Sequence, residues 1–370
     1  MLSHRISAIE PSGIRRVFEL AAKLRADEAI NMSIGQPDFP APEVLKKAAA
    51  QAIMENNNVY GSTQGLPALR EKIAEKLAKK NNIRAEAEDV VVTAGVSGAI
   101  VLLFGAIIDS GDEVILPDPY FVLYKEILSF LGARIVYLDT YPDFHIDAEK
   151  LKGLISSKTK AIVLNTPGNP SGVVFGQEEL EKVVAVAKQA ELLIVADEIY
   201  EQFDYSGKFF SIGSIYPNTV TLNGFSKSHA VPGWRVGYAH GPSDIIKAMN
   251  ILQMYTFVCA PPFAQIALAK TWDEIDISQE ASRYRQNSRL LYEGLKGKYE
   301  IAQSEGAFYA FLKVPSRYRH DQDFCDALFQ RNILAVPGSA FSRRNDYVRL
   351  SFATDKRIIE SGVKILNEMV

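Results

Sequence analysis

Residues 219–239 read TVTLNGFSKSHAVPGWRVGYA and place one lysine in unusual surroundings. The run TVTL before it is apolar and β-branched, which is typical of a buried strand. The chain then breaks at Pro232 and Gly233 and resumes as a second apolar strand with Arg235 at its start. Lys227 lacks the acidic neighbours and the helical periodicity of an ordinary surface lysine. It therefore follows a core strand directly, at the position where α/β folds place their chemistry.

Similar apolar strands recur along the first 265 residues. The seven strand candidates are 90–94, 113–117, 133–138, 161–165, 192–197, 219–223 and 235–239. Segments with helical periodicity lie between several of them, for example 65–82 and 177–191. Such continuous apolar strands predict an α/β fold with a mostly parallel sheet sandwiched by helices.

The pattern changes beyond residue 265, which predicts a second, smaller domain. A long polar helix is expected at 273–298, followed by short strands at AFYAFL (307–312) and YVRLSF (347–352) and by a closing helix. We expect a small α+β domain built from this C-terminal third and the N-terminal segment. The predicted division is 1–40 for the N-terminal arm and part of the small domain, 41–270 for the large domain and 271–370 for the rest of the small domain.

The composition excludes several classes of function. Lys and Arg number 41 against 44 Asp and Glu, and the net charge of −3 comes without a basic run, which argues against nucleic acid as a partner. No apolar stretch has the length of a membrane span. Two cysteines, Cys259 and Cys325, and five scattered histidines indicate neither a disulfide framework nor a metal site. The predicted location is the cytoplasm.

Polar residues follow the ends of several predicted strands. GVSG, after the strand 90–94, opens an apolar helix and could hold an anion with its backbone N–H groups, although a plain turn capped by Ser97 explains it equally well. Asp197 closes a fully apolar strand and is costly to bury unless a cation pairs with it; its alternative is a helix N-cap. Phe121 and Tyr124 follow the strand 113–117, and Asn169 lies in the turn TPGNPSG.

These residues together predict one ligand. A lysine nucleophile at a strand end indicates a Schiff base. A carboxylate that can pair with a pyridinium nitrogen indicates pyridoxal 5′-phosphate (PLP) in particular. The glycine turn and Arg235 would hold its phosphate, and Phe121 would cover its ring.

Six motifs resemble signatures of the class I aminotransferases, which are fold-type I PLP enzymes, and they occur in the family's order. The motif SKSHAVPGWRVGY (226–238) is similar to the signature around the cofactor lysine. The others are VYGSTQGLPALR (59–70), PDPYFVLY (117–124), NTPGNPSG (165–172), VADEIY (195–200) and YVRLSFA (347–353). SGIRRVFELA (12–21) and QMYTFVCAPP (253–262) look most like the branch of broad aspartate and aromatic aminotransferases.

The resemblance implies roles for the residues around the cofactor. Lys227 would form the lysine aldimine and carry the proton between the substrate Cα and the cofactor C4′. Asp197 would keep the pyridine nitrogen protonated, while Asn169 and Tyr200 hydrogen-bond the ring oxygen. Phe121 would stack on the ring, with Tyr124 as a weaker candidate for support of Asp197. The residues implied to hold the phosphate are Val96, Ser97, Ser226 and Arg235.

The resemblance also implies how substrate and a second subunit take part. Arg349 would pair with the substrate α-carboxylate beside the backbone of Gly35 and the amide of Asn169. Tyr60 would reach the phosphate of the neighbouring subunit, so we expect a homodimer with shared sites. Two departures stand out: Pro232 replaces a common threonine, and Ser342 replaces a glycine in PGSAFS (337–342), near the expected entrance.

The predicted function is a PLP-dependent transaminase that moves an amino group from an L-amino acid to a 2-oxo acid, expected to be 2-oxoglutarate, by a ping-pong mechanism. The amino donor stays open, and the candidates for binding a distal carboxylate are Arg15, Arg16 and Arg344. One alternative is a PLP-dependent carbon–sulfur β-lyase on the same fold. A more remote one is a serine hydrolase with Ser97 in a nucleophile elbow, although Ala99 stands where that motif has glycine. A regulatory protein would need a DNA-binding segment, and none stands out.

Overall fold

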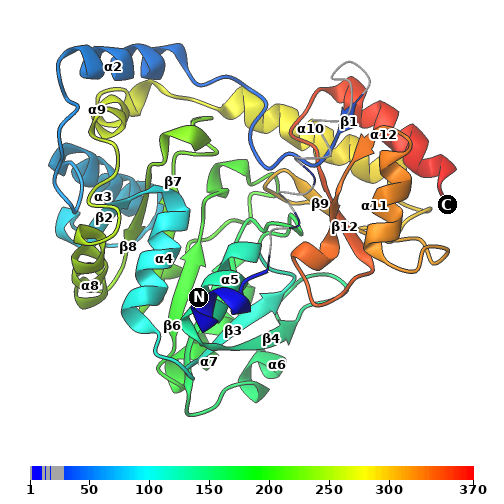
Figure 1. Ribbon diagram of the computed structural model, residues 1–370, viewed down its shortest axis with the longest axis horizontal. Helices are drawn as coiled ribbons and strands as arrows, with labels where there is room; N and C mark the ends of the chain where they lie inside the picture. Colours follow the sequence, from blue (N-terminus) through cyan, green and yellow to red (C-terminus); the bar gives the residue numbers. More distant parts are fainter. Residues whose placement is uncertain (1, 11–12, 14–16, 18–28) are drawn as a thin grey trace.

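The computed structural model describes residues 2–10, 13, 17 and 29–370. Its largest element is a seven-stranded sheet with the order β2-β8-β7-β6-β5-β3-β4 (Figure 1). The strands are β2 (Val90–Thr93), β3 (Glu113–Asp118), β4 (Arg134–Asp139), β5 (Thr159–Asn165), β6 (Leu193–Asp197), β7 (Thr219–Gly224) and β8 (Gly237–His240). Strand β8 alone runs opposite to the other six strands, so the prediction of a mostly parallel α/β sheet is confirmed.

Helices cover both faces of this sheet because alternate apolar residues of the strands point to opposite sides. Val114, Val163 and Val195 pack in one cluster, beneath α4 (Gly95–Ile107), α5 (Val122–Leu131) and α8 (Ser243–Met254). Ile115 and Ile194 pack on the other side, against α6 (Ala148–Gly153) and α7 (Gln177–Gln189). Three further helices pack around β2 and β8: α2 (Glu43–Met54), α3 (Pro67–Asn81) and α9 (Pro262–Lys270).

Local sequence explains where the helices begin and end. Pro67 occupies the first turn of α3, where its missing N–H costs nothing, and Asn82 ends the helix in the left-handed conformation. The polar helix expected at 273–298 is shorter, because Asp276 accepts from the backbone N–H and the hydroxyl of Ser278 and the helix α10 (Ser278–Leu295) starts there. Short 3₁₀ helices are η1 (His4–Ala8), η2 (Ala87–Asp89), η3 (Glu201–Phe203), η4 (Ile212–Ser214), η5 (Pro232–Trp234), η6 (Trp272–Glu274) and η7 (Gly338–Ala340).

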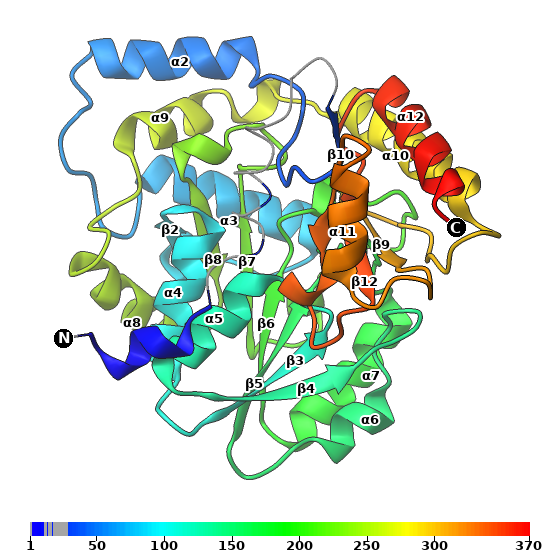
Figure 2. The same cartoon turned by 45° about the vertical axis from the view of Figure 1, so that its right-hand side comes forward.

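A smaller antiparallel sheet, β11-β12-β9, is built from the C-terminal third. Its strands are β9 (Tyr309–Lys313), β11 (Val336–Pro337) and β12 (Tyr347–Ser351). Helix α12 (Lys356–Glu368) lies beside α10, and α11 (Asp321–Phe329) lies in front of the sheet in the turned view (Figure 2). The N-terminal segment reaches this part of the chain, since β1 (Ile30–Asn31) pairs in parallel with β10 (Ile333–Leu334). The boundaries at 40 and 270 stay a prediction.

The topology brings polar residues together at one edge of the large sheet. Strands β3, β5, β6 and β7 run in parallel, so their carboxyl ends share that edge. Strand β2 ends there as well, because it is antiparallel to β8, which is itself antiparallel to β7. The start of α4, Asp118, Asn165, Asp197 and the segment after β7 therefore all lie at one edge.

Candidate functional site

A cavity of about 270 Å³ opens at this edge, between the large sheet and the smaller one. All the site residues predicted from the sequence line it, with the exception of Tyr60. They are Gly35, Val96, Ser97, Phe121, Tyr124, Asn169, Asp197, Tyr200, Ser226, Lys227, Arg235 and Arg349. Residues from seven separate segments therefore meet in one place.

Asp197 forms the floor of the cavity at the end of β6 and is almost fully buried. Its carboxylate accepts hydrogen bonds from the Tyr124 hydroxyl at 2.6 Å and from the backbone N–H of Ile199 at 3.2 Å. Burial raises the pKa of Asp197 to about 6, although both hydrogen bonds and Lys227 favour the ionised form. A buried carboxylate of this kind is suited to a cationic group placed in the cavity.

Lys227 lies across the cavity, just past the end of β7. Its Nζ donates to the backbone oxygen of Gly35 at 2.6 Å and lies 5.8 Å from the centroid of the Tyr200 ring. Burial of the ammonium and the nearby positive charge of Arg349 lower its pKa to about 8. An amine with a pKa this low exists partly in its neutral, nucleophilic form near neutral pH.

Arg349 is the largest of the fully buried side chains and projects from β12 into the cavity. Its Nη1 donates to Asn169 Oδ1 at 3.0 Å and its Nη2 to the backbone oxygen of Ser33 at 3.0 Å. Among the described residues no carboxylate forms a salt bridge with it, and its Nε has no hydrogen-bond partner. Burial lowers the pKa of the guanidinium. The cavity therefore contains a buried cation without an anionic partner.

The start of α4 and Arg235 form an anion-binding corner of the cavity. Val96 and Ser97 lie in the first turn of α4, whose backbone N–H groups are free of helical partners. Arg235 donates from its Nη1 to Pro232 O at 3.0 Å and from its Nη2 to Ala94 O at 3.2 Å. A Cβ on Gly95 would lie only 2.6 Å from the Arg235 guanidinium, so only glycine lets this cation approach the helix start.

Among the lining residues that were not singled out from the sequence, two make side-chain hydrogen bonds to predicted site residues. Tyr309, the first residue of β9, shares a hydrogen bond of 3.1 Å with the hydroxyl of Tyr200, and its ring centroid lies 4.4 Å from the Arg349 guanidinium carbon. Asn165 ends β5 and accepts from the backbone N–H of Asn169 at 2.8 Å. Asn165 has the same signal as Asp197, a polar residue closing an apolar strand, and could have been found by it.

Of the three candidates for a distal carboxylate, the structure describes only Arg344. Arg344 pairs with Asp139 at 2.9 Å and lies over the ring of Tyr141, and it does not line the cavity. Arg15 and Arg16 lie outside the described residues. Tyr60 also lies away from the cavity of its own chain, with its side chain 85% exposed.

The hydrolase alternative lacks its partners. Ser97 lines the cavity, but the described residues that line it include no histidine. A serine needs a hydrogen-bonded base to become a nucleophile. The geometry gives no support to catalysis by Ser97.

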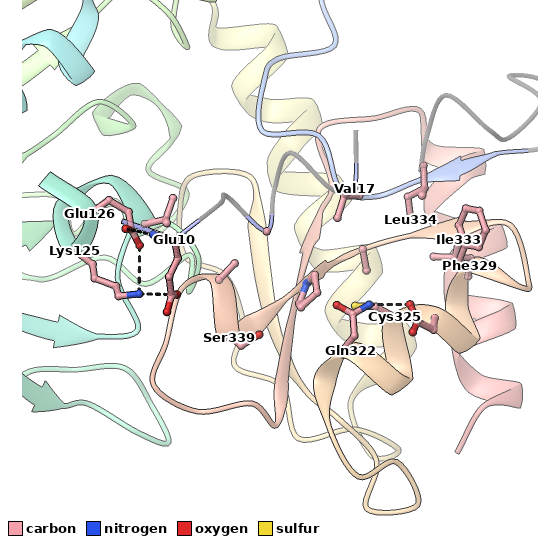
Figure 3. Close-up of a pocket in the computed structure, with 16 residues that line it drawn as sticks. Glu10, Val17, Lys125, Glu126, Gln322, Cys325, Phe329, Ile333, Leu334 and Ser339 are labelled. Atoms are coloured by element: carbon pink, nitrogen blue, oxygen red, sulfur yellow. Dashed lines mark hydrogen bonds and ion pairs between the residues drawn. The ribbon is translucent and has the colours of Figure 1, made fainter. Parts of the chain in front are cut away.

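A second cavity, of about 440 Å³, lies between α5 and α11 (Figure 3). Its lysine, Lys125, is paired with Glu10 at 2.9 Å and with Glu126 at 3.3 Å. None of the site residues predicted from the sequence lines it. The convergent cations and carboxylate belong to the other cavity, which is therefore the candidate active site.

No group of three or more His, Cys, Asp or Glu side chains within the described part of the chain is arranged to hold a metal ion. Likewise, none of the helices in the described ranges combines the length and apolar character needed to cross a membrane.

Comparison with known proteins places the chain in a family. The family model for aminotransferase class I and II matches residues 27–366. The chain belongs to the class I and II aminotransferases. A probable aspartate aminotransferase of Methanocaldococcus jannaschii is 36% identical over 378 residues, and the alignment covers all of both chains.

Thermus thermophilus provides two further matches to this aminotransferase, one by sequence and one by structure. An aspartate/prephenate aminotransferase is 35% identical, with 98% of this chain and 97% of the relative covered. A solved structure of an aspartate aminotransferase with maleate superposes with a TM-score of 0.94 at 34% identity and full coverage of both chains. These relatives confirm the predicted transaminase activity, in which an amino group passes from an amino acid to a 2-oxo acid, and do not support the β-lyase alternative.

Aminotransferases of this family use pyridoxal phosphate, and the residues of the cavity fit that cofactor. Asp197 is a buried carboxylate that suits a protonated pyridine nitrogen, and Lys227 is an amine of lowered pKa that suits an aldehyde. The glycine turn at α4 and Arg235 suit a phosphate. The cofactor prediction is confirmed for the family, and the donor set of this chain agrees with it.

Proposed function

We propose that this aminotransferase binds its amino acid and 2-oxo acid substrates through Arg349 and moves the reacting proton with Lys227. The observation that carries the proposal is the buried, uncompensated guanidinium of Arg349 in the same cavity as an amine of lowered pKa. A substrate α-carboxylate would supply the missing anion, and the planar fork of arginine binds carboxylates with two hydrogen bonds. Asn169, already bonded to Arg349 Nη1, would hold the guanidinium in that orientation.

The cofactor side of the mechanism assigns a role to each of the other residues. When bound, PLP supplies an electron sink for the bonds of the substrate Cα. Lys227 Nζ would take the proton from the substrate Cα and hold it for return, since a base with pKa near the working pH does this well. Asp197 would favour a protonated ring nitrogen by its negative charge, with Tyr124 orienting Asp197. Val96, Ser97, Ser226 and Arg235 would hold the phosphate, Phe121 would cover the ring, and Asn169 and Tyr200 would bind its oxygen.

We further propose 2-oxoglutarate as the amino acceptor and aspartate or an aromatic amino acid as the donor. The support for the donor is the naming of the relatives reported above, which are all named for aspartate, one of them also for prephenate. The acceptor is the one that the family resemblance implies. No lining residue of the described cavity other than Lys227, Arg235 and Arg349 is cationic. A distal carboxylate would therefore be bound by a group from outside this set, for which Arg15, Arg16 and a second subunit are the candidates.

We also propose that the protein forms a homodimer. The apolar side chains of Met54, Val59, Tyr60 and Tyr255 are 80, 73, 85 and 84% exposed. The two segments that carry them adjoin, because Gln253 donates to the backbone oxygen of Thr63 and also to Val92 O at 3.0 Å. Exposed apolar side chains on adjoining segments favour association. A second copy seated on this surface would bring Tyr60 toward the partner's cavity.

A cytoplasmic location and the absence of a nucleic-acid partner stay predictions.

The test is a spectroscopic titration of the cofactor-loaded enzyme with a panel of amino acids. Each competent donor converts the cofactor from its aldehyde to its amine form, which changes the absorbance, and 2-oxoglutarate should reverse the change. We expect aspartate or an aromatic amino acid to be most efficient by kcat/KM, and Lys227→Ala to lose the reaction by at least about 10²–10⁴-fold. Formation of pyruvate and ammonia from cystathionine without any 2-oxo acid would favour a β-lyase activity, and near-normal turnover by Lys227→Ala would contradict the proposed role of Lys227.

A further inference from the structure

The turn between η7 and β12 is tied to the large sheet through one buried serine. Ser342 donates its hydroxyl proton to Asp118 Oδ1 at 2.5 Å. The Oγ of Ser342 in turn accepts from the Tyr141 hydroxyl at 2.8 Å and from the backbone N–H of Arg344 at 2.9 Å. A hydroxyl has one donor and two acceptor positions, so Ser342 uses its full capacity here. We call Asp118, Tyr141 and Ser342 the Asp118 joint.

Asp118 contributes the charge of this joint from the end of β3. Its other oxygen accepts from the backbone N–H of Arg343 at 3.1 Å. Burial raises the pKa of Asp118, while the bonds from Ser342 and Arg343 favour the ionised form. Two residues further on, Tyr120 donates its N–H to Phe341 O at 2.7 Å. The turn 341–344 is therefore held to the segment 118–120 by three direct hydrogen bonds.

The two segments joined in this way both continue into the active site. On one side, Phe121 follows Tyr120 and lines the cavity. On the other, the buried ring of Phe341 lies with its centroid 4.5 Å from the Arg349 guanidinium carbon. A guanidinium against an aromatic face is held by a cation–π interaction. The position of Arg349 relative to the cavity wall thus depends on the turn that the Asp118 joint fixes.

We propose that Ser342 and Asp118 are positioning residues that set Arg349 for the substrate carboxylate. This inference rests on the proposed role of Arg349. Amino acids and 2-oxo acids both carry the α-carboxylate, so a displaced guanidinium weakens both substrates by a similar factor. An interaction made equally in ground and transition states changes KM and leaves kcat nearly unchanged. The family resemblance implies glycine at position 342, and this chain has a serine there, whose hydroxyl makes the bonds of the joint.

The test is Ser342→Ala, which removes the hydroxyl and keeps the Cβ. We expect KM to rise about 10-fold for both the amino acid and the 2-oxo acid, the effect of losing one charge-assisted hydrogen bond, with kcat within about 3-fold. The affinity of the apoenzyme for PLP should not change. Ser339→Ala is the matched control, because Ser339 is exposed in η7, directly before this turn.

A second measurement does not depend on turnover. The backbone N–H groups of Arg343 and Tyr120 cross the joint, so their hydrogen exchange should accelerate in Ser342→Ala and not in Ser339→Ala. Asp118→Asn keeps an acceptor for Ser342 and should give a smaller rise in KM. An unchanged KM with a lower melting temperature in Ser342→Ala would make the joint a structural tie only and overturn the inference.

The variant Arg349→Lys distinguishes the positioning role of Ser342 and Asp118 from the proposed binding of the substrate carboxylate by Arg349. A large rise of KM in Arg349→Lys without any rise in Ser342→Ala overturns the positioning role alone. An unchanged KM in Arg349→Lys shows that the carboxylate binds elsewhere, and then the proposed role of Arg349 and the inference are both wrong. A rise in both variants, with Ser339→Ala unaffected, supports both.

Discussion

At the scale of single residues, Asp197 offers the sharpest test of mechanism. The change to Asn keeps the shape and an acceptor for the Tyr124 hydroxyl but removes the charge beside the ring nitrogen. PLP should still bind through Lys227 and Arg235, so the protein should stay coloured. The half-reaction with amino acid should slow by about 10³-fold, on the order of 4 kcal/mol of transition-state stabilisation. Single-turnover kinetics measure this directly. If Asp197 only caps the turn after β6, Asn is an equally good cap and the rate will hardly change.

Residue types and the positions of strand ends were enough to predict most of the residues that line the cavity. The contacts that form when distant segments pack together could not be predicted in this way. Lys227, Asp197 and Asn169 each follow an apolar strand within the chain, so local pattern locates them. Tyr309 meets Tyr200 from a strand 109 residues away, and Ser342 meets Asp118 across 224 residues. No local signal marks such pairs, because they exist only after two sheets have packed together. The sequence shows serine at position 342 in place of the glycine that the resemblance implies. It does not show the three hydrogen bonds that the Ser342 hydroxyl makes.

At the scale of elements, the turn after β6 carries a buried carboxyl that ties it to α3. Glu198 accepts from Ser211 at 2.6 Å and from the Asn81 amide at 3.3 Å. Burial raises its pKa to about 8 from 4.5, with repulsion from Glu201 and Asp197 adding to the shift and Lys76 and Ser211 opposing it. The folded protein therefore binds this proton more tightly than the unfolded chain does. The stability it contributes is complete below pH 4.5 and is lost as pH rises toward 8.

Glu198→Gln should remove this dependence, because the amide keeps an acceptor for Ser211 and carries no charge. At pH 9 the variant should be more stable than the parent by roughly 3–5 kcal/mol, and near pH 4 the two should be equal. Urea unfolding at several pH values measures the difference. Glu178→Gln, in which the altered residue is exposed on α7, is the control and should show no such trend. Equal stabilities of Glu198→Gln and parent at pH 9 would mean that Glu198 is already ionised at no cost in the fold.

Helices and strands were predicted correctly where hydrophobic periodicity alone decides them. Their direction or boundaries were missed where composition does not distinguish the alternatives or where local capping opposes the periodicity. The seven strands of the large sheet appeared as apolar runs because both faces of that sheet are covered. The antiparallel direction of β8 could not be seen, since an apolar strand has the same composition in either direction. The start of α10 moved five residues because Trp272–Glu274 forms a 3₁₀ turn and Asp276 stops the helix from extending backward.

At the scale of the whole molecule, the exposed apolar surface and Tyr60 predict a dimer with shared sites. Tyr255→Glu places a charge within this surface and should shift the protein toward monomer in sedimentation, with loss of activity. Val370→Ser is the control: it changes an exposed apolar residue that follows α12, outside this surface, and should leave the dimer intact. A fully active monomer at assay concentration would contradict shared sites.

A mixing experiment tests the sharing itself. Tyr60→Ala should weaken PLP retention in the partner's site, and Lys227→Ala should inactivate its own site, so each pure variant should be poor at limiting cofactor. In a mixed dimer one site combines the intact Lys227 of the first variant with the intact Tyr60 of the second, and the other site carries both defects. Random exchange makes about half the dimers mixed, so about a quarter of all sites should regain activity. If Tyr60 acts within its own subunit, each site keeps one defect and mixing restores nothing. Activity at limiting PLP, measured before and after subunit exchange, therefore distinguishes a site completed by the partner from one that each chain builds alone.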